Sequence, residues 1–226
     1  MRFIHADKAE DGAMSLAGRI VKELGAGRRV LWLVCGGSSI STIALAMNEV
    51  ERATKARGVS LDKLVVSLTD ERYGRPGHPD SNWKQLIDAG FDIATVRTLP
   101  VLTGGSLGDT VASYSKALSG AVTEADIVVA VFGIGADGHI AGILPHSSAA
   151  DEGISEYAFG YEAPPLTRIT MTFLAIKDVD VAYAFVFGDA KKSALERLRD
   201  EMLDLAEQPS QILKSLPEAY VYTDAL

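Results

Sequence analysis

The sequence predicts an α/β fold built on a mostly parallel sheet that is flanked by helices. Short, apolar, β-branched runs bounded by Gly, Pro or Asp alternate along the chain with stretches of helical period. Hydrophobic residues make up 47% and charged residues 23% of the 226 residues, values that exclude disordered, collagen-like and coiled-coil proteins. No repeat or low-complexity linker divides the chain, so we expect a single domain over residues 1–226.

The first half of the chain is expected to alternate strands with helices. Strands are predicted at residues 29–35, 64–68, 95–99 and 126–132. A helix capped by Ser38 or Ser39 should run to about Arg57, and a shorter helix should follow a cap in residues 80–82. A third helix is expected over residues 106–118, because its bulky apolar residues recur with a spacing of three or four.

The second half begins with a polar, glycine-containing stretch, residues 147–165, that we expect to be a surface segment or a lid. Strands are predicted at residues 168–173 and 181–187. A helix from Ala190 should bury an apolar stripe that ends at Met202 and Leu205. A short helix over residues 211–216 and a terminal edge strand over residues 219–222 complete the prediction.

Charge and cysteine content limit the partners and the compartment. A formal net charge of -8 repels phosphate backbones and anionic lipids, so neither nucleic acid nor a membrane is an expected partner. The start of the chain lacks the apolar region of a secretion signal, and no apolar stretch approaches the ~20 residues of a membrane-spanning helix. Cys35 is the only cysteine and cannot form an internal disulfide, which favours the reducing cytoplasm. We expect a monomer or a weak homo-oligomer.

Candidate ligand-binding residues follow the first strand, because parallel sheets bind ligands outside the carboxyl ends of their strands. Gly36 and Gly37 permit a close approach of the backbone. Ser38 and Ser39 add hydroxyl groups at a helix start, where free N–H groups attract an anion such as phosphate. An ordinary tight turn uses the same residue types, so both interpretations stay open on these residues alone.

Charged residues also lie at the ends of three other predicted strands, either directly after the strand or at its first residue. Asp70, Glu71 and Arg72 come after the second strand, where three consecutive charges taken alone favour a solvated loop. Arg168 begins a later strand and Lys191 follows the next one. Each is typical of a solvated surface, but an acidic protein with an anionic substrate needs local cations of this kind.

A glycine-rich loop follows the strand at residues 126–132. Residues 133–138 match G-x-G-x-x-G, but Pro145 comes too early for the helix of a dinucleotide site. His139 in this loop is placed to act as a general base, because histidine is the side chain that enzymes use most often in this role. Many loop histidines are nevertheless ordinary surface residues. The four histidines have no H-E-x-x-H or similar ligand spacing, so no metal or other cofactor is expected.

Taken together, these motifs resemble the family of 6-phosphogluconolactonases and glucosamine-6-phosphate deaminases. The resemblance rests on residues 35–39, 70–72 with 78–82, 133–145, 168–170 and 188–191, in the same order over roughly residues 30–200. It implies a three-layer, sugar-phosphate isomerase-like fold. It also implies hydrolysis of 6-phospho-D-glucono-1,5-lactone to 6-phosphogluconate, a step of the oxidative pentose phosphate pathway, with a small sugar phosphate as the only partner.

The resemblance also implies roles for individual residues. His139 would take a proton from the attacking water, and Asp137 would orient the imidazole or hold the water. Arg72 would face the carbonyl or the developing oxyanion. The 6-phosphate would be bound by the glycine–serine loop and two cations, namely Gly36, Gly37, Ser38, Ser39, Arg168 and Lys191.

Two alternatives stay open. A deaminase or aldose–ketose isomerase of the same family would use Asp70 to move protons. The deaminases carry an Asn–Glu pair before the proline where this chain has Ile143 and Leu144, which makes deamination the weaker hypothesis. A non-catalytic sugar-phosphate-binding protein would have no use for both Asp137 and His139.

Overall fold

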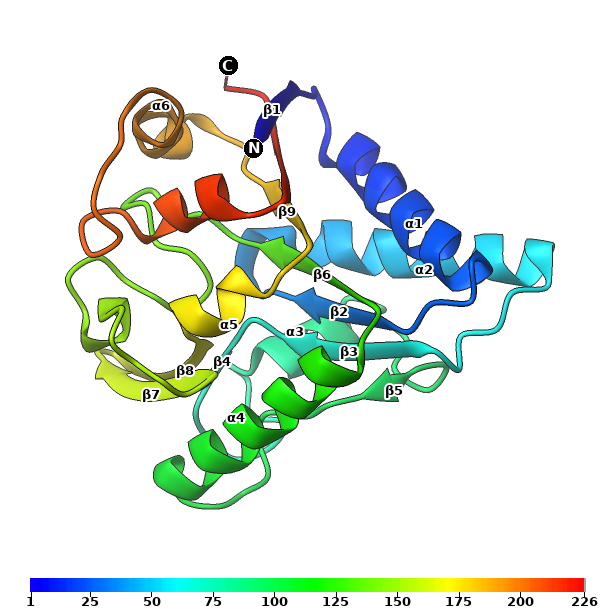
Figure 1. The fold of residues 1–226 in the computed structure, drawn as a ribbon, viewed down its shortest axis with the longest axis horizontal. Helices are drawn as coiled ribbons and strands as arrows, with labels where there is room; N and C mark the ends of the chain where they lie inside the picture. The colour runs from blue at the N-terminus through cyan, green and yellow to red at the C-terminus, as the bar shows by residue number, and fades with distance from the viewer. Residues whose placement is uncertain (226) are drawn as a thin grey trace.

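A computed structural model describes residues 1–225 and contains two β-sheets (Figure 1). Within these residues the larger sheet has seven strands, in the order β1 (Arg2–His5), β10 (Glu218–Thr223), β9 (Val181–Phe185), β6 (Ile127–Phe132), β2 (Val30–Val34), β3 (Leu64–Leu68) and β5 (Arg97–Thr98). All of its neighbouring strands pair in parallel. The smaller sheet is antiparallel, in the order β4 (Asp70–Arg72), β8 (Leu166–Met171) and β7 (Ala158–Ala163). The predicted α/β class is confirmed.

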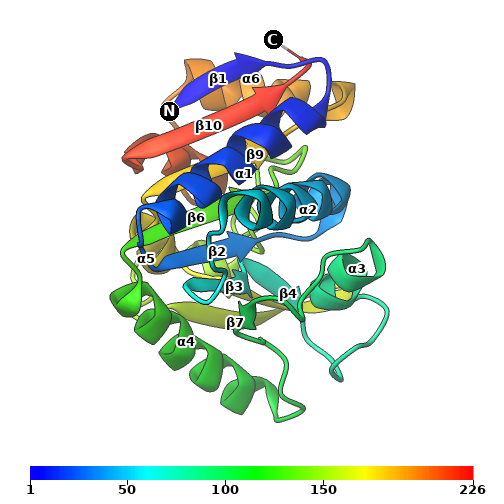
Figure 2. The same cartoon turned by 90° about the vertical axis from the view of Figure 1, so that its right-hand side faces the viewer.

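Helices cover both faces of the parallel sheet, which makes a three-layer molecule (Figures 1 and 2). α1 (Ala9–Gly25) and α2 (Ile40–Arg57) pack against each other on one face. The other face carries the small sheet together with α4 (Leu107–Glu124), α5 (Phe173–Lys177) and α6 (Lys192–Asp200). α3 (Asn82–Asp88) follows β4 and packs against both β4 and α2. The remaining helical turns are 3₁₀ segments at Gly37–Ser39, Ser148–Ala150, Asp189–Lys191 and Pro209–Ser215.

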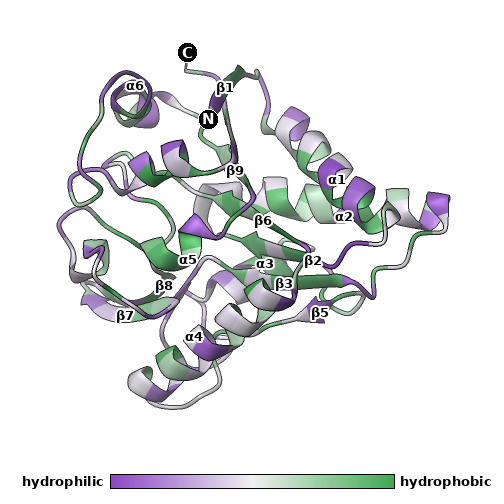
Figure 3. Cartoon of the chain, in the orientation of Figure 1, coloured by the Kyte–Doolittle hydropathy of each residue, from purple (hydrophilic) through white to green (hydrophobic). Residues whose placement is uncertain are grey.

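The central strands are apolar along their whole length because both faces of the sheet are covered. Every side chain of β2 and β6 is buried, and Figure 3 shows the hydrophobic residues concentrated in the sheet. The predicted cap in residues 80–82 is Ser81, which accepts a hydrogen bond from the Lys84 N–H at 3.2 Å. Ser106, for which no cap was predicted, likewise accepts one from the Asp109 N–H at 3.2 Å. Local pattern and tertiary burial agree in this part of the chain.

Two predictions about exposed segments are wrong. The second half of the expected surface segment 147–165 is the strand β7, with Ala158 and Tyr161 buried, because it pairs with β8 across the small sheet. The expected edge strand near the C-terminus is β10, an interior strand. β1, to which the sequence analysis assigned no structure, pairs with the outer side of β10. The helix α1 was also not predicted.

Several predicted boundaries also differ from the structure. α6 ends at Asp200, so Met202 lies beyond the helix and is 85% exposed. α4 continues to Glu124, and β5 has two residues, Arg97 and Thr98. Ser39 does not cap α2, because the backbone makes a 3₁₀ turn over Gly37–Ser39 and the Ser39 side chain forms no cap hydrogen bond.

The order of the strands brings the candidate residues together. β9, β6, β2 and β3 are consecutive in the sheet, so the four polar segments that follow them meet at one edge. The chain runs from β2 to β3 on one side and from β6 to β9 on the other, a reversal of strand order at which open α/β sheets bind ligands. Among residues 1–225, no helix is long and apolar enough to cross a membrane.

Candidate active site

A cleft of about 280 Å³ lies at the carboxyl ends of the central strands. It is lined by the segments after β2, β6 and β9 and by the small sheet. The lining residues are Cys35, Gly36, Gly37, Ser38, Asp70, Arg72, Gly133, Ile134, Gly135, His139, Ala141, Arg168 and Lys191. Residues separated by more than 150 positions in the sequence therefore share one site.

The loop after β6 is held in place by its isoleucines. Ile134, Ile140 and Ile143 are buried and form two isolated β-bridges with one another. The Gly135 N–H donates to the His139 carbonyl oxygen at 3.1 Å, which closes the tip of the loop. A Cβ at Gly135 would lie 2.1 Å from His139 Nδ1, so only glycine leaves room for the imidazole. Buried apolar residues thus fix the position of the polar ones.

His139 and Asp137 form a hydrogen-bonded pair at this tip. His139 Nδ1 lies 2.7 Å from Asp137 Oδ1, which also accepts a hydrogen bond from the His139 backbone N–H at 3.1 Å. The hydrogen bond from the imidazole lowers the pKa of Asp137. An ionised carboxylate only accepts hydrogen bonds, so Nδ1 is the donor, and in the neutral imidazole this leaves a free lone pair on Nε2. That lone pair is what a general base needs.

The small sheet contributes two arginines that face each other. Arg72 of β4 pairs directly with Arg168 of β8, although like charges in this position destabilise a sheet. The Nε atoms of both are buried and have no hydrogen-bond partner among the described residues. The nearest carboxylate oxygen, Asp70 Oδ2, is 3.8 Å from Arg72 Nε. This concentration of positive charge is suited to an anionic ligand.

Lys191 adds a third cation and connects two of the loops. Its Nζ donates to Ser38 Oγ at 3.1 Å, which joins the segment after β9 to the segment after β2. Burial lowers the pKa of Lys191, because the charged ammonium loses hydration. Gly37 has a φ of +71°, a backbone conformation that favours glycine and allows the tight turn beneath Ser38.

Asp70 and Glu71 are not part of a solvated loop, which corrects the prediction made from three consecutive charges. They are 5% and 1% exposed, because this stretch is the strand β4 between β8 and α3. Glu71 accepts hydrogen bonds from Ser81 Oγ at 2.8 Å and from the Asn82 N–H at 2.6 Å. Burial raises the pKa of Glu71, while these donors oppose the rise.

Asn82 and Cys35 are site residues that the sequence analysis missed. Asn82 Nδ2 donates to the Asp70 carbonyl oxygen at 2.9 Å and lies 3.3 Å from Asp70 Oδ2, so it fixes the direction of Asp70. In the sequence it belongs to the predicted helix cap and to the 78–82 motif, neither of which indicates a contact with Asp70. Cys35 lines the cleft as a neutral thiol, because burial raises its pKa to about 12. Its place directly after β2 was the available signal.

Most of the candidate residues meet in the cleft. Ser39 does not line it, since its side chain is 1% exposed and turned into the protein. Asp137 reaches the cleft through its hydrogen bond to His139. In the described part of the chain, no group of three or more His, Cys, Asp or Glu side chains could hold a metal ion.

The fold and the cleft together define a class of protein: a parallel α/β domain with a hydrogen-bonded His–Asp pair beside a cluster of cations. The model of one family, described as glucosamine-6-phosphate isomerases/6-phosphogluconolactonase, matches residues 6–221. The chain therefore belongs to this family, which confirms the resemblance found in the motifs.

Individual relatives agree with the family assignment. The chain is 30% identical over 156 residues to 6-phosphogluconolactonase of Caulobacter vibrioides, a match that covers 64% of this chain and 66% of that protein. It is 26% identical over 200 residues to 6-phosphogluconolactonase of a Nostoc species, covering 81% and 82%. The crystal structure of a 6-phosphogluconolactonase from Shewanella baltica has the same fold, with a TM-score of 0.80 at 19% identity over 98% of this chain and 97% of that one.

Proposed function

We propose that this protein hydrolyses 6-phospho-D-glucono-1,5-lactone to 6-phosphogluconate, a reaction of the oxidative pentose phosphate pathway. The observation that carries the proposal is the placement of the His139–Asp137 pair and the cations Arg72, Arg168 and Lys191 in one cleft. The relatives from Caulobacter and Nostoc, both 6-phosphogluconolactonases, support this choice within the family.

His139 is the general base of the proposed reaction. Its Nε2 takes a proton from a water molecule as the water oxygen attacks the lactone carbonyl carbon. The bond between that carbon and the ring oxygen then breaks, and the imidazolium returns the proton to the ring oxygen. The products are a carboxylic acid, which ionises, and a free hydroxyl group. Asp137 holds the imidazole in the correct tautomer and stabilises its charge.

The three cations have different roles in the proposed reaction. Arg72 faces the carbonyl oxygen and stabilises the negative charge that develops on it. Arg168 and Lys191 bind the 6-phosphate together with the Gly36–Gly37 backbone and Ser38. Ser39 is left out of this binding set, because it does not line the cleft.

Deamination or isomerisation of an amino-sugar phosphate is the second candidate, because Asp70 also lines the cleft and could move a proton. Two observations weigh against it. Asp70 is held by Asn82 and lies beside Arg72, contacts that fix the position of its carboxylate. Ile143, at the place of the deaminase Asn–Glu pair, is completely buried and brings no carboxylate to the cleft.

A non-catalytic sugar-phosphate-binding protein is the third candidate. It would need the cations but not the histidine base. Gly135 leaves space for the His139 imidazole, although a glycine loses more conformational entropy on folding than any other residue. This use of a glycine favours catalysis.

Acid production from freshly generated 6-phosphogluconolactone, corrected for spontaneous hydrolysis, tests the proposal. The wild-type protein should accelerate it and should release no ammonia from glucosamine 6-phosphate. The same assay after exhaustive chelation should give an unchanged rate, because the proposed base needs no metal. Ammonia release without lactone hydrolysis would replace the proposal by the second candidate. Binding of 6-phosphogluconate without turnover would replace it by the third.

We further propose that the enzyme acts in the cytoplasm as a monomer or weak homo-oligomer and without nucleic-acid partners. The single cysteine and the net charge of -8 support this proposal. Sedimentation velocity at several concentrations tests the oligomeric state, and a stable oligomer at nanomolar concentration would contradict it.

A further inference from the structure

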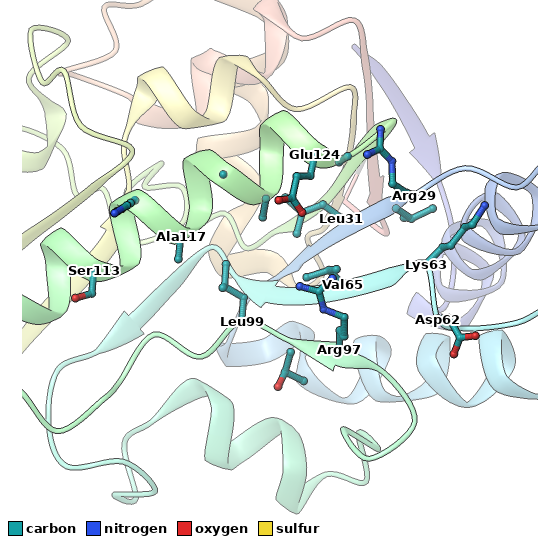
Figure 4. Close-up of a pocket in the computed structure, with 16 residues that line it drawn as sticks. Arg29, Leu31, Asp62, Lys63, Val65, Arg97, Leu99, Ser113, Ala117 and Glu124 are labelled. Carbon is teal, nitrogen blue, oxygen red and sulfur yellow. The ribbon is translucent and has the colours of Figure 1, made fainter.

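A second hollow lies at the opposite end of the parallel sheet from the candidate active site (Figure 4). It lies beside the amino ends of β2, β3 and β6, because Arg29, Lys63 and Ala125 directly precede or border those strands. Its volume is about 680 Å³, compared with about 280 Å³ for the cleft at the carboxyl ends. Volumes of roughly 300–1,000 Å³ are typical of small-molecule sites.

Two apolar walls form a slot inside this hollow. Leu31, Val65 and Leu99 form the wall on the sheet side, and Figure 4 shows them beneath α4. The opposite wall is α4 itself, which presents small residues, among them Ala117 and Ala121. Small residues keep the helix surface flat and leave Val65 partly exposed in the otherwise buried strand β3. A slot of this kind accepts a flat apolar body.

Positive charge gathers around the slot in a protein whose net charge is -8. The lining contains two arginines and two lysines against two carboxylates, those of Asp62 and Glu124. Arg29 is paired with Asp126 at 2.7 Å, and Lys63 donates to the Gly27 carbonyl oxygen.

The side chains of Arg97 and Lys116, the other two cations of the slot, have no hydrogen-bond or ion-pair partner among residues 1–225. Two uncommitted cations beside an apolar slot are complementary to a molecule with a negatively charged group and an apolar body.

We infer that this slot is a second ligand site, which binds a small anion with a flat, apolar, aromatic body. Val65 and Leu99 contact one face of that body and α4 contacts the other, while Arg97 on β5 and Lys116 on α4 supply the positive charge that attracts the anionic group. A sugar phosphate lacks the apolar body, so the site is chemically distinct from the cleft that holds His139.

The probe for the test is 8-anilinonaphthalene-1-sulfonate, which joins an aromatic body to one sulfonate. It is titrated into the full-length protein with saturating 6-phosphogluconate present, so that the active-site cleft is occupied. Fluorescence and calorimetry should both give one saturable site. The double variant Arg97→Ala, Lys116→Ala should weaken binding by about tenfold or more, since it removes the two uncommitted positive charges that attract the sulfonate.

Control variants and a control probe distinguish the contribution of the cations to binding from that of the apolar slot. Ala117→Phe fills the slot and should also weaken the probe, while both cations remain. Lys55→Ala removes an exposed lysine of α2 outside the hollow and should change nothing. N-phenyl-1-naphthylamine, the same kind of body without a charge, should bind the wild type more weakly and should not respond to the double variant. All variants should keep full lactone hydrolysis and an unchanged circular-dichroism spectrum.

The inference is overturned if the probe fails to bind the wild-type protein. Equal affinity of the double variant and the wild type overturns it as well, because the cations would then have no part in binding. Binding that survives Ala117→Phe unchanged places the probe elsewhere and has the same consequence.

Discussion

The two ends of the parallel sheet carry two hollows of opposite character. At the carboxyl ends, the smaller hollow brings together polar groups from three loops and the small sheet, and hydrogen bonds join His139 to Asp137 and Lys191 to Ser38. At the amino ends, the larger hollow has apolar walls and isolated cations. The amino-end hollow has the greater volume, whereas the proposed catalytic residues lie in the carboxyl-end cleft.

We proposed the catalytic site at the carboxyl end because of the preorganised contacts found there and not because of its volume. The His139–Asp137 hydrogen bond and the Lys191–Ser38 contact hold reactive groups in fixed positions before any ligand arrives. Arg97 and Lys116 have no such partners, so the amino-end hollow can bind but has no arranged base or nucleophile. Variants at the two ends should therefore behave differently.

The largest expected effect is that of His139→Ala at the carboxyl end. The kcat of lactone hydrolysis should fall by about 10² to 10⁴, with little change in KM, because general-base catalysis contributes that much to the transition state alone. Steady-state kinetics corrected for spontaneous hydrolysis measure it. The exposed His5→Ala, on the edge strand β1, is the control and should be normal. Near-normal turnover of His139→Ala would remove His139 from the mechanism.

Gly135→Ala should have the next largest effect. The added Cβ would lie 2.1 Å from His139 Nδ1 and 2.5 Å from Asp137 Oδ1, so the pair must move. A displacement of about 1 Å can lower turnover by about 10²-fold. Kinetics together with thermal unfolding distinguish lost catalysis from lost folding. Full activity of this variant would show that the position of the pair is not critical.

Arg168→Ala and Lys191→Ala should each weaken recognition of the phosphate. The expected loss is about 1.5–3 kcal/mol in kcat/KM for the phosphorylated lactone, the range for charged hydrogen bonds. Glucono-1,5-lactone, which has no phosphate, should be affected much less. If both substrates lose the same amount, these residues support the fold and not the phosphate site.

Lys191 should also take up protons when the product binds. Burial lowers its pKa in the free protein, and a bound phosphate dianion raises the pKa again by favouring the charged ammonium. At a pH between these two values, binding of 6-phosphogluconate should therefore add a fraction of a proton, and affinity should fall as pH rises. Calorimetry at a series of pH values, in buffers of different ionisation enthalpy, measures the uptake. Lys191→Met should abolish it, and an equal uptake in that variant would assign the proton to another group.

The smallest effect is expected at the amino end, from Gly120→Ala. Gly120 lies inside α4, and a Cβ there meets no atom within 4 Å. Alanine should stabilise the helix by about 0.4–1 kcal/mol and leave lactone hydrolysis unchanged. Urea unfolding and the standard assay measure both quantities. A loss of activity would show that the two ends of the sheet are coupled.

Local sequence determined the central strands, the caps at Ser81 and Ser106, and the identity of most cleft residues. It did so because these features depend on neighbouring residues: a continuous apolar run is suited to a strand with both faces covered, and a serine accepts a hydrogen bond from the residue three positions on. The position of His139 directly after such a strand was equally local information.

Only the tertiary structure decided which charged residues are buried, which strands are edges and which groups face one another. The charges of Asp70 and Glu71 predicted a solvated loop, because the burial of these residues depends on β8 and α3, two elements that come later in the chain. β10 is interior because β1, more than 200 residues away, covers its outer side. The opposition of Arg72 and Arg168 likewise results from the register of two distant strands, and no local pattern encodes that register.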